Sequence, residues 1–331
     1  MKLEQRIELM TRLGHYLGSA DEDLNQCIEW AARENGWFTE DFIRASMQHI
    51  ANQYLDEKKL KHFTQTLTEL PIDRQKNIGV VMAGNIPLVG FHDALSVFLS
   101  GHILQAKLST KDHVLMPFLL KKLISWAPEI SERLQIKDML KGCDAYIATG
   151  SSNSARYFEY YFSRFPHVIR RNRTSVAILT GNETDEELAA LADDVYLYFG
   201  LGCRNVTQIC VPQGYNFEKL LQAFRKYDAL KDHNKYRNNY DYNLALYILN
   251  AQYYMSNESL LLIENDAVFS PISVLHYRYY QAVDEIYQAY QNHQDIQLIV
   301  GKDFVPFGKA QSPELRDFAD GVNTMDFLSS L

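Results

Sequence analysis

The sequence has no long apolar run, few cysteines and no surplus of positive charge. A membrane-spanning helix needs roughly 18 consecutive apolar residues or more, and polar side chains interrupt every apolar stretch before that length. We therefore predict no membrane span. The first six residues, MKLEQR, are mostly polar and lead into no apolar secretory segment, so we expect a cytoplasmic protein.

The four cysteines are Cys27, Cys143, Cys203 and Cys210, and only the last two are close in sequence. They form no C-x2-C pair and no cluster with histidine, so we predict no metal site. Free thiols in a reducing compartment are the simplest interpretation. One of them could be catalytic.

The formal net charge is −8 at pH 7. An acidic balance argues against nucleic acid as the main partner. One local run departs from it, and comprises Arg164, His167, Arg170, Arg171 and Arg173. That run predicts either a solvated basic turn or a phosphate-binding rim for a cofactor or coenzyme.

The chain has 331 residues, more than the roughly 100–200 of a single domain, so we expect two domains. Apolar residues recur at helical spacing through residues 1–70. Beyond them, short apolar strands alternate with helices, which predicts a parallel sheet covered by helices. The strands are expected at 77–83, 101–107, 145–148 and 176–179.

The turns after three of these strands contain Asn85, Lys107 and Ser151. Ligands bind at the carboxyl ends of the strands in such sheets, so these turns are candidate ligand contacts. The later part of the chain is less regular. It predicts strands at 207–211, 260–263 and 296–300, a helix at 215–227 and a polar, tyrosine-rich loop at 231–243.

Cys203 lies in the segment Gly200-Leu201-Gly202-Cys203-Arg204. Glycines before a cysteine let the backbone approach a ligand closely. The neighbouring arginine favours the thiolate, which is the nucleophilic form of the side chain. The alternative is a buried core cysteine, the usual state of a lone cysteine, and this segment alone does not decide between them.

Seven short motifs, in order and with similar spacing, resemble those of the aldehyde dehydrogenases. They are Gly84-Asn85-Ile86-Pro87-Leu88, Lys107-Leu108-Ser109-Thr110, Thr149-Gly150-Ser151, the segment 170–179, Gly200-Leu201-Gly202-Cys203, Phe269-Ser270-Pro271 and Pro306-Phe307-Gly308. No single tripeptide is specific. The stretches ATGSSNSAR, RNRTSVAIL, GLGCRNV and VPFGKAQSPELRDFADGVNTMDFL are similar to one branch, the LuxC-type acyl-CoA reductases. The resemblance runs from about residue 75 to the C-terminus.

The resemblance implies an α/β, aldehyde dehydrogenase-like fold. Such a fold combines a Rossmann-type parallel-sheet cofactor domain with a smaller α/β catalytic domain, here preceded by a helical N-terminal segment. We expect the helical segment at 1–74, packed on an NADP-binding domain at 75–180. The catalytic cysteine domain is expected at 181–331, and its C-terminal tail is a candidate to return to the cofactor domain.

The resemblance also implies the reduction of an acyl-CoA, in particular a fatty acyl-CoA, to the aldehyde. Cys203 would attack the thioester carbonyl and expel CoA. The Asn85 side-chain amide and the Cys203 backbone N–H would stabilise the oxyanion. Aldehyde dehydrogenases use a glutamate to hydrolyse their acyl-enzyme, and Arg170 takes its position here, which favours a reductase.

The cofactor-binding residues implied by the resemblance are Lys107, Ser109, Thr110, Gly150 and Ser151. Thr110 replaces a glutamate that would bind the ribose diol. Because a carboxylate would repel a 2′-phosphate, its absence favours NADPH over NADH. Ser151 would approach the cofactor phosphates at a helix N-terminus, and the alternative is a plain serine N-cap.

Other interpretations remain open. The chain could reduce another acyl thioester or acyl phosphate, carried by a protein or short in length, or be a catalytically silent acyl-binding subunit. A second copy of the chain, in a homo-oligomer, or an acyl-donor protein is a candidate partner under any of these interpretations. His92 and His276 are candidate general acids, with structural roles as the alternative. The tyrosine-rich stretches near residues 240 and 280 either pack in the core or line an acyl tunnel.

Overall fold

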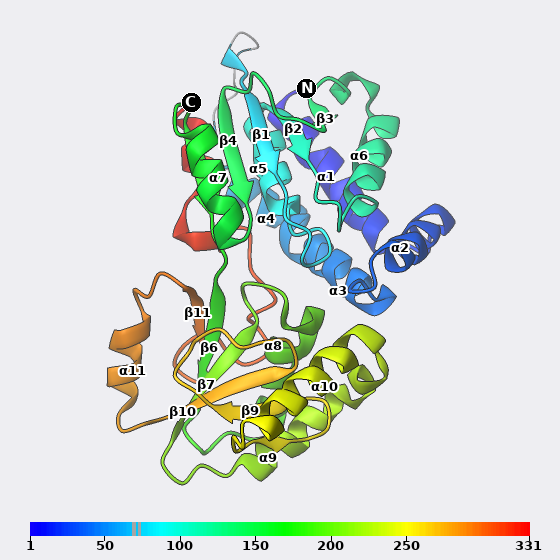
Figure 1. Ribbon diagram of the computed structural model, residues 1–331. Helices are drawn as coiled ribbons and strands as arrows, with labels where there is room; N and C mark the ends of the chain where they lie inside the picture. Colours follow the sequence, from blue (N-terminus) through cyan, green and yellow to red (C-terminus); the bar gives the residue numbers. More distant parts are fainter. Residues whose placement is uncertain (68–70, 72–73) are drawn as a thin grey trace. The chain divides into compact units, whose positions relative to one another are not determined.

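The structure is a computed structural model that describes residues 1–67, 71 and 74–331 (Figure 1). It divides into two compact units. Unit 1 contains Met1–Asn172 together with Pro313–Leu331, and unit 2 contains Arg173–Ser312. In the part of the chain that the structure describes, no helix is long and apolar enough to span a membrane.

Unit 1 begins with the predicted helices. They are α1 (Leu3–Leu17), α2 (Glu22–Glu34), α3 (Glu40–His49), the π-helical turn η1 (Ile50–Tyr54) and α4 (Glu57–Phe63). The Asp21 carboxylate accepts from the Leu24 N–H at 3.0 Å and so caps α2. Leu13, Leu24 and Ile43 are fully buried in one core with the strands of the first sheet. Burial of this apolar face holds the helical segment on that sheet.

The first sheet contains five parallel strands in the order β3-β2-β1-β4-β5, which is the Rossmann-type order. The strands are β1 (Asn77–Val81), β2 (Ile103–Lys107), β3 (Leu134–Ile136), β4 (Ala145–Thr149) and β5 (His167–Arg170). The helices between them are α5 (Phe91–Ser100), α6 (Leu115–Trp126), the 3₁₀ turn η3 (Pro128–Ile130) and α7 (Ser152–Phe162). Figure 1 shows β1 in the middle, between β2 and β4. The chain order therefore reverses at β1, where a doubly wound sheet forms its ligand crevice.

The C-terminal segment of unit 1 carries the 3₁₀ turn η6 (Ala319–Gly321) and α12 (Thr324–Ser329). Met325 and Leu328 are buried in the same core as β1 and α5. This segment therefore completes unit 1 although it follows unit 2 in sequence.

The second sheet belongs to unit 2 and has the strand order β11-β6-β7-β10-β9-β8. Its strands are β6 (Thr174–Ile178), β7 (Val206–Pro212), β8 (Met255–Ser256), β9 (Leu261–Glu264), β10 (Val274–Tyr280) and β11 (Ile296–Val300), and only the β8–β9 pair is antiparallel. Its helical elements are α8 (Asp185–Tyr196), η4 (Leu197–Gly200), α9 (Phe217–Ala223), η5 (Phe224–Asp232), α10 (Asn234–Leu249) and α11 (Val283–Tyr290). The two sheets with their helices confirm the predicted α/β class.

Two details differ from the expectations. The cofactor domain expected at 75–180 includes the strand at 176–179, but β6 pairs with β7 and β11 and so lies in the second sheet. The boundary between the units accordingly falls at residue 172 rather than 180. The loop predicted at 231–243 is helical, because Tyr236, Tyr240 and Asn243 recur at helical spacing and form the buried face of α10.

Candidate active site

Asn85 lies in a turn that connects β1 to α5 and whose backbone conformation is unusual. Leu88 has a φ of 59°, which places a branched residue in the left-handed region. The Ser46 hydroxyl donates to the Pro87 carbonyl at 2.8 Å, so helix α3 holds the turn from one side. The Asn85 side chain is half-buried. Its amide is therefore placed by a fixed turn at the carboxyl end of the central strand.

Asp112 joins this turn to the loop that follows β2. Its Oδ2 accepts from the Leu88 N–H at 2.8 Å, and its own N–H donates to the Ser109 carbonyl at 3.2 Å. Burial raises the pKa of the Asp112 carboxyl to about 6. Nothing in the sequence marks Asp112 as part of the site, since an aspartate next to Lys111 and His113 is typical of an ordinary polar turn.

The predicted cofactor residues Lys107, Ser109 and Thr110 lie at the carboxyl end of β2. Lys107 pairs with Val81 in the sheet register, and its exposed side chain has no ion-pair partner among the described residues. The Ser109 hydroxyl accepts from the Lys111 N–H at 3.2 Å. A Cβ added to Gly84 would lie 2.7 Å from the Ser109 Cβ, so the loops after β1 and β2 touch.

Gly150 and Ser151 follow β4, the strand on the other side of β1. The Gly150 N–H donates to the Arg170 carbonyl at 3.2 Å. The Ser151 hydroxyl caps α7 by accepting from the Ser154 N–H at 3.2 Å. The serine N-cap is thus present. All five predicted cofactor residues lie at one edge of the first sheet, beside the turn that carries Asn85.

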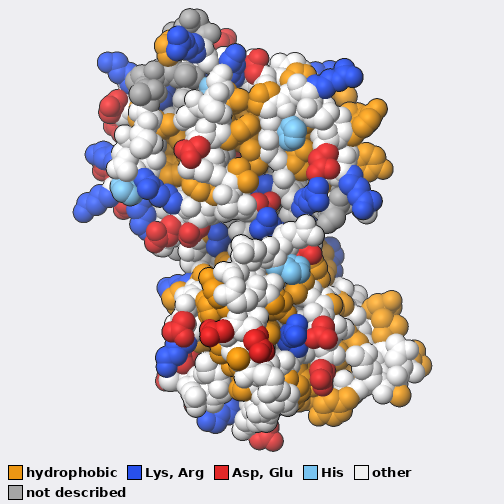
Figure 2. Space-filling view, turned by 90° about the vertical axis from the view of Figure 1, so that its left-hand side faces the viewer, with side chains coloured by type: hydrophobic (Ala, Val, Ile, Leu, Met, Phe, Trp, Pro, Cys, Tyr) orange, Lys and Arg blue, Asp and Glu red, His pale blue; other side chains and the backbone are white. Residues whose placement is uncertain are grey.

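Arg170 does not belong to an exposed basic rim. Its guanidinium is buried, forms an ion pair with the buried Asp93 of α5 and donates to the Thr324 hydroxyl of α12 at 2.8 Å. Arg171 is exposed and pairs with Glu159. The phosphate-rim interpretation is therefore wrong for Arg170, whose buried guanidinium is paired with a carboxylate within unit 1. For Arg171 it stays a prediction, because its ion pair is exposed. On the face shown in Figure 2, lysines and arginines are interspersed with acidic side chains.

Cys203 lies in unit 2, in the turn between η4 and β7. Three successive residues before it, Tyr198, Phe199 and Gly200, have φ values of 56°, 58° and 75°. Left-handed backbone at two bulky aromatic residues is strained, and such strain concentrates at functional sites. The Ser175 hydroxyl of β6 donates to the Cys203 carbonyl at 3.2 Å. The cysteine is therefore held at the amino ends of β6 and β7.

Asn205 fixes the shape of this turn. Its side-chain oxygen accepts from the Gly202 N–H at 2.8 Å. Its amide nitrogen donates to the carbonyls of Asp194, Val195 and Leu197 at 3.1, 3.3 and 2.8 Å. The side chain is fully buried. It supplies hydrogen-bond donors to carbonyls at the end of α8 that have no partner within the helix. An asparagine two residues after the cysteine was the available signal in the sequence.

Cys203 is the only one of the four cysteines that is not buried. Burial raises the pKa of the Cys27 and Cys210 thiols to about 12, and it also raises the pKa of Cys143. These three thiols are therefore inert at neutral pH. Exposure alone singles out Cys203 as the candidate nucleophile.

The two candidate general acids have structural partners. A ring nitrogen of His92 lies 2.9 Å from the Leu315 carbonyl within unit 1. His276 is buried on β10, its Nδ1 lies 2.7 Å from the Ala267 carbonyl, and burial lowers its pKa. Both histidines thus hold backbone segments in place.

No protein-family model and no curated protein sequence matches this chain. Solved structures do match it. The first is a protein from Burkholderia cenocepacia assigned to the aldehyde dehydrogenases, with a TM-score of 0.69 at 13% identity, covering 98% of this chain and 80% of that one. The fold is that of the aldehyde dehydrogenases.

Two further structures show the same likeness. An indole-3-acetaldehyde dehydrogenase from P. syringae, in complex with NAD⁺, has a TM-score of 0.65 at 12% identity over 91% of this chain and 72% of its own. An NADP-dependent enzyme from E. coli has a TM-score of 0.65 at 11% identity over 91% and 73%. At such identities the likeness establishes the aldehyde dehydrogenase fold, and the chemistry has to be argued from the residues.

Proposed function

We propose that this protein is an NADPH-dependent oxidoreductase that reduces an acyl-CoA, in particular a fatty acyl-CoA, to the aldehyde through a thioester on Cys203. The observation that carries the proposal is the Cys203 turn. It presents the one thiol that is not buried, directly after a strained backbone segment, in a chain with the aldehyde dehydrogenase fold.

In this proposal the Cys203 thiolate attacks the acyl carbonyl carbon, and the carbon–sulfur bond to CoA breaks. The departing CoA thiolate takes up a proton. The residues at the ends of β2 and β4 would hold NADPH, which would supply a hydride to the acyl carbon of the Cys203 thioester. The resulting hemithioacetal oxyanion collapses by breaking its carbon–sulfur bond, which releases the aldehyde and restores the Cys203 thiolate. The Cys203 backbone N–H and the Asn85 amide are the oxyanion donors in the proposal.

The burial of Arg170 and its ion pair with Asp93 support a reductase over an aldehyde-oxidising enzyme. It occupies the position of the glutamate that activates water in the aldehyde dehydrogenases, as the resemblance aligns them. Its guanidinium is buried against Asp93 and cannot act as a base. Without a base for water, the acyl-enzyme would persist until hydride transfer.

The residues at the end of β2 fit an NADP cofactor. Lys107 is an exposed cation at the strand terminus, and Thr110 is also exposed. The nearest acidic residue of this loop, Asp112, is buried, and its carboxylate is turned to the backbone of Leu88. A 2′-phosphate would therefore meet a positive side chain here without facing this carboxylate.

The deciding experiment mixes the protein with NADPH and a long-chain acyl-CoA and follows NADPH absorbance, aldehyde formation and intact mass. We expect NADPH loss with aldehyde formed, and a Cys203 acyl adduct when NADPH is omitted. Cys203→Ala should abolish both while NADPH binding persists. Cys143→Ala, which removes an inert thiol, is the matched control and should retain both.

The alternatives give different results in the same assay. Turnover with acetyl-CoA or an acyl phosphate, but not with the long-chain thioester, would identify another acyl donor. A Cys203 adduct without NADPH loss would indicate a missing cofactor or partner. Neither an adduct nor NADPH loss would favour another acyl donor or the catalytically silent acyl-binding subunit. Turnover by Cys203→Ala would overturn the covalent mechanism.

A further inference from the structure

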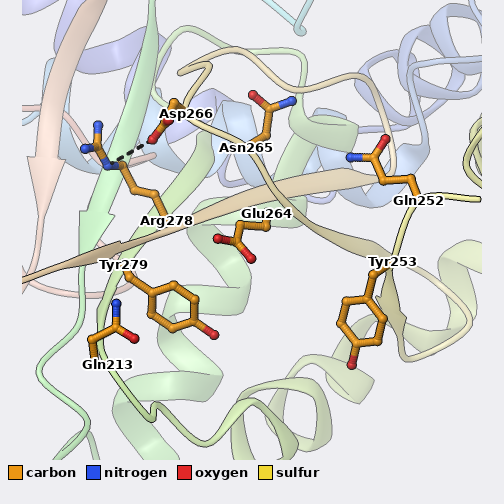
Figure 3. A pocket seen from close by; sticks show the side chains of 8 residues that line it. All are labelled: Gln213, Gln252, Tyr253, Glu264, Asn265, Asp266, Arg278 and Tyr279. Atoms are coloured by element: carbon orange, nitrogen blue, oxygen red, sulfur yellow. Dashed lines mark ion pairs between the residues drawn. The ribbon is translucent and has the colours of Figure 1, made fainter.

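A cavity of about 610 Å³ lies in unit 2, at the carboxyl ends of the parallel strands β7, β9 and β10. Figure 3 shows the side chains that line it, which are Gln213, Gln252, Tyr253, Glu264, Asn265, Asp266, Arg278 and Tyr279. None of the predicted site residues is among them. The lining is polar and aromatic, with no aliphatic side chain.

This cavity is separate from the Cys203 turn. Cys203 precedes the first residue of β7, Val206, while Gln213 follows its last residue, Pro212. A strand of seven residues spans about 23 Å. The two features therefore lie at opposite ends of one strand, and the inference below does not depend on the proposed function.

The lining carries one uncompensated negative charge. Arg278 forms an ion pair with Asp266, with its Nε 3.4 Å from the carboxylate oxygen. Glu264, the last residue of β9, has no ion-pair partner among the described residues. Because Asp266 and Arg278 offset each other, a ligand would meet the charge of Glu264.

Two tyrosine rings line the cavity together with that carboxylate. In Figure 3 the Glu264 carboxylate lies between the side chains of Tyr279 and Tyr253. Tyr277 is buried, and its ring centroid lies 5.7 Å from that of Tyr279. Burial, and next the Glu264 carboxylate, raise the pKa of Tyr277 to about 12. The lining therefore places aromatic rings in the same cavity as a carboxylate that has no ion-pair partner among the described residues.

A carboxylate flanked by aromatic rings attracts organic cations through charge pairing and cation–π contact. A metal ion is the less suitable ligand, because among the described residues no group of three or more histidine, cysteine or acidic side chains is placed so that it could hold one. We propose that this cavity binds a small alkylammonium compound, with its cationic nitrogen against Glu264 and between Tyr253 and Tyr279. In Figure 3 Gln213 lies on the Tyr279 side of Glu264 and Gln252 on the Tyr253 side, so their amides would contact polar groups on either side of the cationic nitrogen.

The test uses choline as the quaternary probe, propylammonium as the primary probe and 3,3-dimethylbutanol as the neutral analogue of choline. Binding to the full-length protein is followed by ligand-detected NMR. We expect at least one cation to bind and the neutral analogue to bind at least several-fold more weakly. Stronger binding of choline would identify a quaternary ligand, and stronger binding of propylammonium a primary amine.

Glu264→Gln removes the charge from an exposed position and should weaken cation binding about fivefold, as expected for one partly exposed charge pair. Tyr253→Ala removes a ring that is 72% exposed. It should weaken the binding of choline more than the binding of propylammonium. Glu285→Gln, on the exposed face of α11, is the matched control and should change nothing. Equal binding of the neutral analogue, binding unaffected by both pocket variants, or no binding of either cation would overturn the proposal.

Discussion

At the scale of single residues, Asp194 shows how one buried carboxyl holds two segments together. It is fully buried on α8, and its oxygens accept from the Gly308 and Ala310 N–H groups at 2.7 and 2.9 Å. Loss of hydration on burial nevertheless raises its pKa to about 7. The side chain therefore fixes the Pro306-Phe307-Gly308 turn while its charge is disfavoured.

This raised pKa has a definite consequence for stability. Between about pH 4 and pH 7 the folded state binds the Asp194 proton more tightly than the unfolded state, so the free energy of unfolding falls as pH rises. We expect the unfolding free energy of wild type minus that of Asp194→Asn to fall by about 1 kcal/mol for each unit that the pH rises in this window. Urea unfolding at pH 4 to 8 measures it. A difference that stays constant would show that the carboxyl titrates near its ordinary pKa.

At the scale of elements, the loops after β1 and β2 can touch because Gly84 has no side chain. A Cβ on Gly84 would lie 2.7 Å from Ser109 Oγ and 3.1 Å from the Asp112 backbone nitrogen. Both loops are anchored, so neither can move away freely. This contact aligns the turn of Asn85 with the end of the strand that carries Lys107.

Gly84→Ala should therefore separate the two loops. We expect the free energy of unfolding to fall by about 1–3 kcal/mol, as overpacking of a well-packed site does, and NADPH affinity to fall with it. Gly18→Ala is the matched control, because the nearest atom to its added Cβ is 3.8 Å away and its φ of −90° suits alanine. Equal stability of the two variants would show that the loops are not fixed against each other.

The elements also show what a sequence can predict. The caps at Asp21 and Thr39 are predictable because each is a bond to an N–H three residues away. The strand ends that carry Lys107 and Ser151 follow from the alternation of strands and helices. Helix α10 escapes prediction because its buried face is made of tyrosine and asparagine instead of aliphatic residues.

The anchors of the candidate site are not visible in the sequence for a different reason. Asp112 bonds to a backbone N–H 24 positions away, and Arg170 pairs with a carboxylate 77 positions away. Such partners are set by the strand order rather than by local spacing. Folding brings these partners together, and they cannot be identified from the residue types alone.

At the scale of the molecule, α12 is the part of unit 1 that stands apart in sequence. Leu328 is 1% exposed and packs in the core of unit 1. Leu328→Ala should lower the stability of this unit by about 2–5 kcal/mol, through lost burial and the cavity left behind. All three tryptophans, Trp30, Trp37 and Trp126, lie in unit 1.

Tryptophan fluorescence therefore reports the unfolding of unit 1 selectively. The Leu328→Ala transition should shift to lower urea when it is followed in this way. Ser329→Ala alters the exposed neighbour on the same helix and serves as the control. An unchanged tryptophan transition in Leu328→Ala would mean that α12 contributes little to the core of unit 1.

The return of residues 313–331 to unit 1 also sets an order of events during protein synthesis. Unit 2 is continuous in sequence, so all of it leaves the ribosome before residues 313–331 of unit 1 do. At about 5–20 residues per second, the first sheet and its helices wait several seconds with the groove for Met325 and Leu328 uncovered. In that interval the nascent chain is most prone to aggregate and most in need of chaperone binding.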